Sequence, residues 1–183
     1  QVKLVYGYGL GPELEDAVVV GLHAGTPHGP SQAFVLVYAL EGGKAVLKAE
    51  LPLRQYFIGF EVLTMNQKPV LAIHGASGAH FDDLWLYRFP QGTPELLLAQ
   101  GSAAGVELRA DPSGNPQVWV GIENWDDPTW NYATGEPRWN VYAWDGRQFA
   151  LDSQLSTALV KTAGERADGY VAAVLSHMKD SGQ

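Results

Sequence analysis

The segment from residue 122 to residue 140 holds the densest group of side chains that could bind a ligand. It places aromatic rings among carboxylates, and its candidate ligand-binding residues are Glu123, Trp125, Asp126, Asp127, Trp130, Tyr132 and Trp139. Rings can stack on the C–H faces of a sugar or on a cation, while carboxylates accept hydrogen bonds from hydroxyl groups. Long connections on a rigid scaffold often carry such residues. The segment predicts a site for a carbohydrate or a protein partner, although the same rings could also pack together as a small core.

The carboxylates of this segment raise a second possibility, a carbohydrate-active hydrolase. Glu123 or Asp127 would act with Glu136, because glycoside hydrolysis needs two carboxyl groups that flank the scissile bond. Spacing along the sequence does not fix the distance between these groups, and Asp126, Asp127 and Pro128 also form a pattern typical of a turn. We therefore predict no catalytic residues, and the favoured function is a non-catalytic binding or scaffold module.

Histidines and aspartates form the other group with possible chemistry. His23 and His74 each follow a predicted strand, and His80, Asp82 and Asp83 come soon after His74. Imidazole and carboxylate groups are ligands for zinc and other transition metals. The sequence has no HExxH or comparably specific spacing, so we expect no metal site.

No motif predicts a cofactor. Ser77 lies in a turn of small residues, but the sequence after it alternates like a strand, whereas a serine nucleophile elbow needs a helix there. Neither GxxxxGK[ST] nor a dinucleotide-binding GxGxxG motif occurs in a strand-to-helix context. The chain has no cysteine, which excludes disulfide scaffolds and cysteine nucleophiles.

Composition and charge exclude several classes of partner. The 183 residues include 12 Lys and Arg against 20 Asp and Glu, for a net charge of -8. This charge repels a phosphate backbone, and no basic cluster offsets it, so we expect no nucleic acid partner. No apolar run approaches the roughly 18 residues of a membrane span, so we expect no membrane insertion. The chain begins with Gln1 and not with Met, so it was either processed or trimmed; among these alternatives we expect an extracytoplasmic protein, secreted or periplasmic.

Twelve short apolar runs predict twelve β-strands in a single domain. They lie at residues 2–8, 17–23, 33–40, 45–51, 57–65, 69–74, 84–89, 95–99, 106–110, 117–122, 139–144 and 148–151. Each run is rich in Val, Leu or aromatic residues and is bounded by Gly, Pro, Asn or Asp, which are common in turns. Short connections such as 41–44 and 145–146 predict hairpins and therefore an antiparallel meander.

An internal repeat divides this meander into three units. Tyr38, Tyr87 and Tyr142 occupy the same place in three similar segments, at spacings of 49 and 55 residues. The units span about residues 1–56, 57–104 and 105–154. A period near fifty residues with four short strands is typical of the blades of a β-propeller. The predicted fold is all-β, with three propeller-like four-stranded units.

Residues 111–121 resemble the FG-GAP or VCBS type of β-propeller repeat. The resemblance rests on the strand rhythm and on one loop, in which Asp111, Ser113 and Asn115 precede a short apolar strand that ends in Gly121. Members of that family present several carboxylates to calcium, whereas this loop has one, so calcium binding does not carry over.

Propellers close with four to eight blades, so three units leave exposed edges. Head-to-tail dimerisation, a longer chain, or a curved open sheet or sandwich in place of blades would resolve this.

The last thirty residues change to a helical period. Apolar residues from Ala167 to Met178 recur at helical spacing, and Thr162 and Glu165 have the spacing of a capping box, which predicts a helix over residues 162–180. This helix could cover the sheets or bind another chain. A purely structural subunit is thus a third possibility, with a sheet edge or the stripe of Tyr170, Val174 and Met178 as the partner surface and a homodimer as one form.

Overall fold

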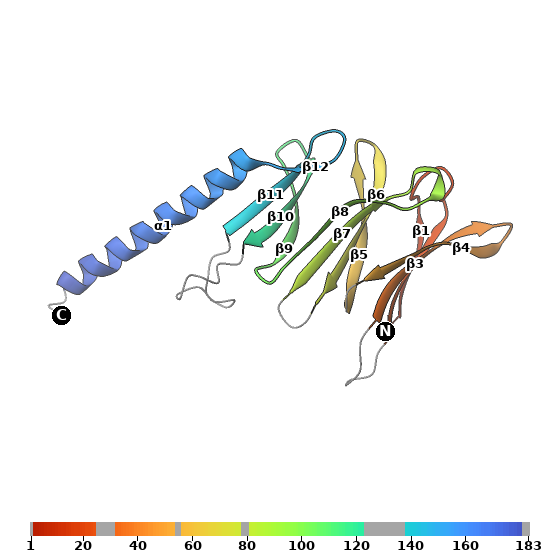
Figure 1. Ribbon diagram of the computed structural model, residues 1–183, viewed down its shortest axis with the longest axis horizontal. Helices are drawn as coiled ribbons and strands as arrows, with labels where there is room; N and C mark the ends of the chain where they lie inside the picture. Colours follow the sequence, from red (N-terminus) through yellow and green to blue (C-terminus); the bar gives the residue numbers. More distant parts are fainter. Residues whose placement is uncertain (1, 25–31, 54–55, 78–80, 123–137, 181–183) are drawn as a thin grey trace.

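The computed structural model of the chain describes residues 2–24, 32–53, 56–77, 81–122 and 138–180. In this part of the chain, twelve β-strands are followed by one α-helix (Figure 1). The strands form three four-stranded antiparallel sheets, and each sheet is a meander in chain order. The predicted all-β fold with three propeller-like units and a C-terminal helix is confirmed.

Every predicted strand is present, and each begins and ends within three residues of its predicted bounds. The first sheet contains β1 (Val2–Tyr8), β2 (Ala17–Ala24), β3 (Gln32–Glu41) and β4 (Lys44–Leu53). The second contains β5 (Tyr56–Met65), β6 (Lys68–Ala76), β7 (Asp82–Arg88) and β8 (Glu95–Ser102), with a 3₁₀ turn at Pro90–Gly92. The third contains β9 (Val106–Ala110), β10 (Pro116–Ile122), β11 (Arg138–Trp144) and β12 (Phe149–Leu151).

The tight connections follow from the residue types at the turns. In the β3–β4 hairpin, Glu41 pairs with Lys44, and the two residues between them, Gly42 and Gly43, have φ angles of 57° and 78°. A two-residue turn with both φ angles positive continues the twist of the strands, and glycine adopts it without strain. The third sheet closes its last hairpin through Asp145, whose carboxylate accepts hydrogen bonds from backbone N–H groups of the same turn. These hydrogen bonds lower the pKa of Asp145.

The three tyrosines occupy equivalent places in the three sheets. Each lies on the third strand, between an aliphatic residue of the second strand and a leucine of the fourth. The sets are Val18, Tyr38 and Leu47; Leu71, Tyr87 and Leu96; and Val118, Tyr142 and Leu151. The pairing also shifts by one residue immediately before Tyr38 and before Tyr87. The internal repeat read from the sequence is therefore a repeat of structure.

The sheets stack face to face in an open row (Figure 1). One core lies between the first and second sheets and includes Val19, Val35 and Ile73, with Tyr87 packed against it. Another lies between the second and third sheets and includes Leu86 and Val118, with Tyr142 packed against it. The tyrosine-bearing face of the second and third sheets is thus turned toward the preceding sheet. The equivalent face of the first sheet is the outer face at that end of the row.

The helix α1 (Ser153–Asp180) begins about ten residues earlier than predicted. Asp152 caps it, because its carboxylate accepts a hydrogen bond from the N–H of Leu155 at 2.9 Å. The proposed cap Thr162 lies inside the helix instead, and its hydroxyl donates to the carbonyl of Ala158 at 2.9 Å. The prediction of a start near residue 162 is therefore wrong. The predicted stripe began at Ala167, although Leu155, Ala158 and Leu159 already recur at helical spacing.

The first turns of α1 are joined to β11. The hydroxyl of Ser156 accepts a hydrogen bond from the N–H of Val141 at 2.9 Å and donates one to the carbonyl of Asp152 at 2.7 Å. Ser156 is 7% exposed, and Val141 is fully buried. Farther along, Val171 and Leu175 are more than half exposed. The helix is thus anchored to the third sheet at its start and leaves it toward its end (Figure 1).

In the described part of the chain, α1 has too little continuous apolar sequence to serve as a membrane-spanning helix.

Candidate functional site

One of the seven predicted ligand-binding residues, Trp139, belongs to the described part of the chain. It lies on β11 opposite Gly121 of β10. The other six, Glu123, Trp125, Asp126, Asp127, Trp130 and Tyr132, lie outside the described residues, as does Glu136 of the hydrolase alternative. The candidate site is therefore described from β10 and β11, the strands that flank residues 123–137.

Trp139 belongs to a group of side chains on the outer face of the third sheet. Successive residues of a strand point to opposite faces, so the buried Val118 and Val120 of β10 face the second sheet, and Trp119 points the other way. Glu107 of β9 pairs directly with Trp119, and Arg109 lies two residues farther along the same strand. Alternation along three adjacent strands thus brings these side chains to one face.

Three of these residues form what we call the outer aromatic cluster: Arg109, Trp119 and Trp139. The guanidinium carbon of Arg109 lies 4.0 Å from the ring centroid of Trp119 and 5.4 Å from that of Trp139. The two indole rings meet edge to face, with centroids 6.1 Å apart and an angle of 65° between planes. A cation on the face of an indole ring is stabilised by the ring quadrupole, by about 0.5–1 kcal/mol at an exposed site.

Polar contacts fix the orientation of the cluster. The Nε of Arg109 donates to the Oε2 of Glu107 at 2.7 Å, and the Nε1 of Trp119 donates to the Oε1 of Gln117 at 3.1 Å. The side chains of Arg109 and Glu107 are 41% and 47% exposed, so their charges face solvent. The rings are partly buried. The cluster is a preorganised, amphipathic patch that can contact another molecule without a large loss of side-chain freedom.

Sequence reasoning found Trp139 but missed Arg109 and Trp119. Both lie in predicted strands. The available signal was their alternation with apolar residues, because Leu108 precedes Arg109 and Trp119 stands between Val118 and Val120. Alternation marks two faces but does not say which of them the neighbouring sheet covers. The register between β9, β10 and β11 was also needed to bring the three residues together.

The histidine and aspartate residues of the metal hypothesis do not gather in the described part of the chain. His74 contacts Glu61 across β5 and β6, with Nε2 and Oε1 3.0 Å apart, and the hydroxyl of Ser77 donates to the carboxylate of the buried Asp83 at 2.5 Å. Among the described residues, no three His, Asp or Glu side chains are placed to share a metal ion. The imidazole of His23 and the whole of His80 lie outside the described residues.

The loop with a calcium-like sequence is satisfied by its own hydrogen bonds. The Oδ1 of Asp111 accepts from the backbone N–H groups of Ser113 and Asn115 at 2.8 Å, and its Oδ2 accepts from the side-chain amide of Asn115 at 3.0 Å. The hydrogen bonds from Asn115 and the loop backbone lower the pKa of Asp111. The carboxylate therefore stabilises the turn between β9 and β10.

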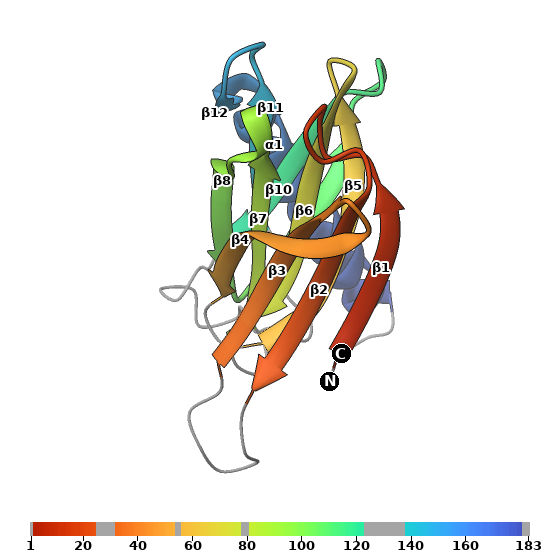
Figure 2. The ribbon, with the colours of Figure 1, turned by 90° about the vertical axis from the view of Figure 1, so that its right-hand side faces the viewer.

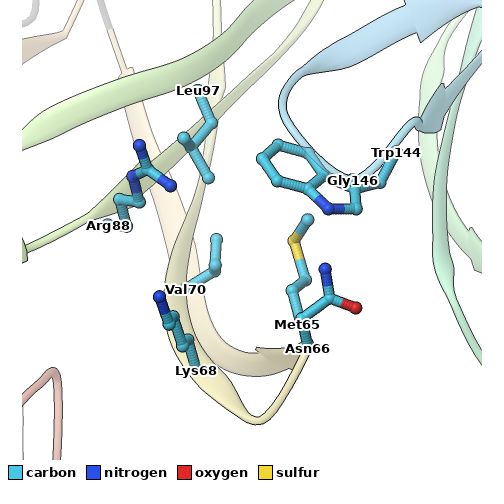
Figure 3. A pocket seen from close by; sticks show the side chains of 8 residues that line it. All are labelled: Met65, Asn66, Lys68, Val70, Arg88, Leu97, Trp144 and Gly146. Carbon is cyan, nitrogen blue, oxygen red and sulfur yellow. The ribbon is translucent and has the colours of Figure 1, made fainter.

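A small hollow lies where the turns of the second and third sheets meet (Figure 3). Its volume is about 90 Å³, and its lining residues are Met65, Asn66, Lys68, Val70, Arg88, Leu97, Trp144 and Gly146. Arg88 and Lys68 lie on one side of it and Trp144 on the other (Figure 3). Arg88 is held by two hydrogen bonds to Glu95, which also lower the pKa of Glu95. The buried Nε1 of Trp144 has no hydrogen-bond acceptor among the described residues.

The chemistry of this hollow suits one small acidic group. Lys68 forms no ion pair with other described residues and can donate to an anion, while the apolar walls suit a short carbon chain. Its size allows a group of a few heavy atoms, much less than the roughly 300–1,000 Å³ of usual ligand pockets. The outer aromatic cluster combines two indole rings with a solvent-facing ion pair and is the stronger candidate site.

No protein-family model matches the chain, and comparison with curated proteins and with solved structures gave no match either. The resemblance of residues 111–121 to FG-GAP or VCBS repeats thus stays a prediction.

Proposed function

We propose that the chain is a non-catalytic binding module that recognises a protein segment through the outer aromatic cluster. One observation carries the proposal: Arg109 is stacked on Trp119 and Trp139 on a partly exposed sheet face. Tryptophan and arginine are the residues most enriched among the energetic hot spots of protein interfaces, because they combine a large apolar area with polar or charged groups.

The arrangement of the rings favours a protein partner over a carbohydrate. A sugar that stacks on an aromatic platform needs a free ring face. In the cluster, the guanidinium of Arg109 lies over one face of Trp119, and Trp139 meets Trp119 edge to face. A peptide can use the partly exposed rings, the guanidinium and the carboxylate of Glu107 together.

The surroundings of the cluster support the same role. The hydrogen bonds of Trp119 to Gln117 and of Arg109 to Glu107 hold these side chains before a partner arrives. A preorganised patch loses less conformational entropy on binding, and so more of the contact energy contributes to affinity. The predicted aromatic and acidic segment, residues 123–137, joins β10 to β11 directly beside Trp139 in the sequence.

The test uses defined probes, because the natural partner is unidentified. Random peptides displayed on phage are selected on the whole chain, and the selected peptides are synthesised and titrated calorimetrically. We expect Arg109→Ala and Trp119→Ala each to weaken binding at least tenfold, which corresponds to about 1.4 kcal/mol. Arg147→Ala is the matched control, because Arg147 is an exposed arginine of the same sheet. Circular dichroism shows whether each variant keeps the fold.

A soluble oligosaccharide panel runs in parallel. Two outcomes would contradict the proposal. Either the selected peptides bind both cluster variants with unchanged affinity, or the selection yields no peptide whose binding depends on the cluster. Oligosaccharide binding lost in the same variants would assign the site to a carbohydrate instead. Oligosaccharide turnover that disappears in Glu123→Gln would support the hydrolase alternative.

A further inference from the structure

The outer face of the first sheet is apolar along its two central strands. The residues of β2 and β3 that point away from the second sheet are Val18, Val20, Leu22, Phe34, Leu36 and Tyr38. None of them is charged, and all except Val18 are partly exposed. An antiparallel sheet with one solvated face normally alternates apolar and polar residues. Residues 17–22 and 33–40 are instead continuous apolar runs, which is the pattern of strands covered on both faces.

The equivalent positions of the second sheet show what covers such a face. Val20 and Leu36 form a cross-strand pair two residues from Tyr38. The equivalent pair in the second sheet, Ile73 and Trp85, is 0% and 9% exposed, because the first sheet lies across it. The tyrosine-bearing face of these units is therefore a surface for sheet-on-sheet packing.

The β3–β4 hairpin adds to the same surface. Its tip projects from the first sheet on the side away from the second sheet (Figure 1). The hairpin exposes three large apolar side chains, since Leu40 is 47%, Val46 36% and Leu47 49% exposed. Figure 2 looks at the first sheet from outside, and no described helix or other sheet lies in front of it.

The opposite end of the row is different. The outer face of the third sheet carries Glu107, Arg109 and Gln117, and α1 leaves this sheet on the side away from the second sheet (Figure 1). In the described residues, a helix thus lies where a further sheet would stack. Repeat proteins need terminal capping units with a polar outer face, and these polar residues fit that role.

We propose that the outer face of the first sheet, together with the β3–β4 hairpin, is a dimerisation surface on which a second copy docks by the same face about a twofold axis. A twofold interface requires a self-complementary patch, and the uncharged side chains that β2 and β3 place on this face fulfil this condition. Each copy carries a net charge of -8, so two copies approach with least repulsion over the uncharged strands β2 and β3, beside which Glu50 of β4 lies opposite Leu36. The head-to-tail dimer considered from the sequence would place this face against α1 and the polar face of the third sheet.

The size of the surface is that of a weak interface. Four strands about 4.8 Å apart, with about seven residues each at 3.3 Å, give a footprint of roughly 450 Å². This is about half of the ~800 Å² that each partner buries in an interface of standard size, and the projecting β3–β4 hairpin adds to it.

The test compares three equivalent leucines. Leu47, Leu96 and Leu151 lie opposite the three tyrosines and are 49%, 50% and 49% exposed, so the fold tolerates a charge at each. Sedimentation equilibrium of the whole chain should give twice the monomer mass of 19.8 kDa at micromolar concentration. We expect Leu47→Glu to raise the dimer dissociation constant at least tenfold and Leu96→Glu and Leu151→Glu to leave it within twofold. Leu36→Glu gives a second probe at the centre of the face.

Several outcomes would overturn the proposal. These are a wild-type chain that stays monomeric, a dimer that Leu151→Glu dissociates but Leu47→Glu does not, or assemblies larger than a dimer. Peptide binding by the outer aromatic cluster is read separately in Leu47→Glu. Loss of dimers with retained peptide binding shows that the two surfaces act independently.

Discussion

The first and third sheets share one strand plan but differ in the faces that they turn outward. In both, a tyrosine of the third strand lies between an aliphatic residue and a leucine of the neighbouring strands. The first sheet turns Val20 and Leu36 to the outside, and the third turns Arg109 and Trp119. A repeated backbone therefore does not fix the role of a unit. The side chains on the uncovered face decide whether a unit packs against another sheet, ends the row of sheets or binds a partner.

The largest expected effect comes from the two glycines at equivalent places in the second strands. A Cβ at Gly121 would lie 2.4 Å from the backbone oxygen of Ala104, and a Cβ at Gly21 would lie 2.1 Å from the side chain of Phe57. A backbone shifts less readily than a ring, so we expect Gly121→Ala to cost roughly 3 kcal/mol and Gly21→Ala less. Urea unfolding of both variants measures the difference. Equal losses would show that Phe57 is as fixed as the backbone.

A smaller difference is expected for two equivalent valines. Val120 is 8% exposed and packs against the second sheet, whereas Val20 is partly exposed on the outer face of the first. Val120→Ala, which removes two methyl groups from the covered position, should lower the free energy of unfolding by about 1–2 kcal/mol. Val20→Ala, at the uncovered position, should lower it by less than about 1 kcal/mol. The free energy of unfolding is measured at dilutions that keep the chain monomeric. A larger loss in Val20→Ala would contradict the distinction between the two faces.

The attachment of α1 to the third sheet depends on Ser156. Ser156→Ala removes the acceptor for the N–H of the buried Val141, and an unsatisfied buried donor costs about 1–2 kcal/mol. We expect faster amide exchange at Val141 and lower stability. Ser153→Ala is the control, because Ser153 is exposed at the first position of the helix. Unchanged exchange at Val141 in Ser156→Ala would mean that the helix is held by other contacts.

The cluster on the third sheet should contribute less to stability than to binding. Arg109→Met keeps most of the side-chain length but removes the cation from Trp119 and the hydrogen bond to Glu107. We expect a loss of about 0.5–1 kcal/mol in unfolding free energy and a change in tryptophan fluorescence. A loss above about 2 kcal/mol would indicate a structural role for Arg109.

The smallest expected effect is on stability at alkaline pH. Burial raises the pKa of Tyr87 above its ordinary value of about 10, because the covered face disfavours the phenolate. The neutral phenol of Tyr87 therefore contributes to stability below pH 10, and this contribution is lost as the pH rises through the higher pKa of the folded state. Tyr87→Phe should therefore show a shallower loss of stability above pH 10, measured by urea unfolding. Tyr38→Phe is the matched control at the equivalent uncovered position, and an identical change there would contradict the role of the neighbouring sheet.

Most of the fold could be predicted because its signals are local. Glycine, proline, asparagine and aspartate at the turns bound each strand, and the spacing of Tyr38, Tyr87 and Tyr142 marks the repeat. The start of α1 was not predicted, although Leu155, Ala158 and Leu159 recur at helical spacing, because Thr162 and Glu165 offered a competing cap farther along. The helix begins at the cap Asp152 and is joined to β11 through Ser156.

The candidate site could be predicted only in part. Trp139 was found because it lies at the end of an aromatic segment, whereas Arg109 and Trp119 belong to short strands without any unusual composition. Their meeting depends on pairing between β9 and β10 and between β10 and β11. Such pairing joins residues distant in sequence, and local patterns do not encode it.

The sequence by itself determined the strands, the turns and the threefold repeat, because these follow from backbone preferences and from alternation within a few residues. It also determined that residues 17–22 and 33–40 are apolar on both sides. Only the tertiary structure decided which face of each sheet is covered, because burial depends on the neighbours that the stacking order provides. That order leaves the first sheet with an apolar outer face and places Arg109, Trp119 and Trp139 together at the other end.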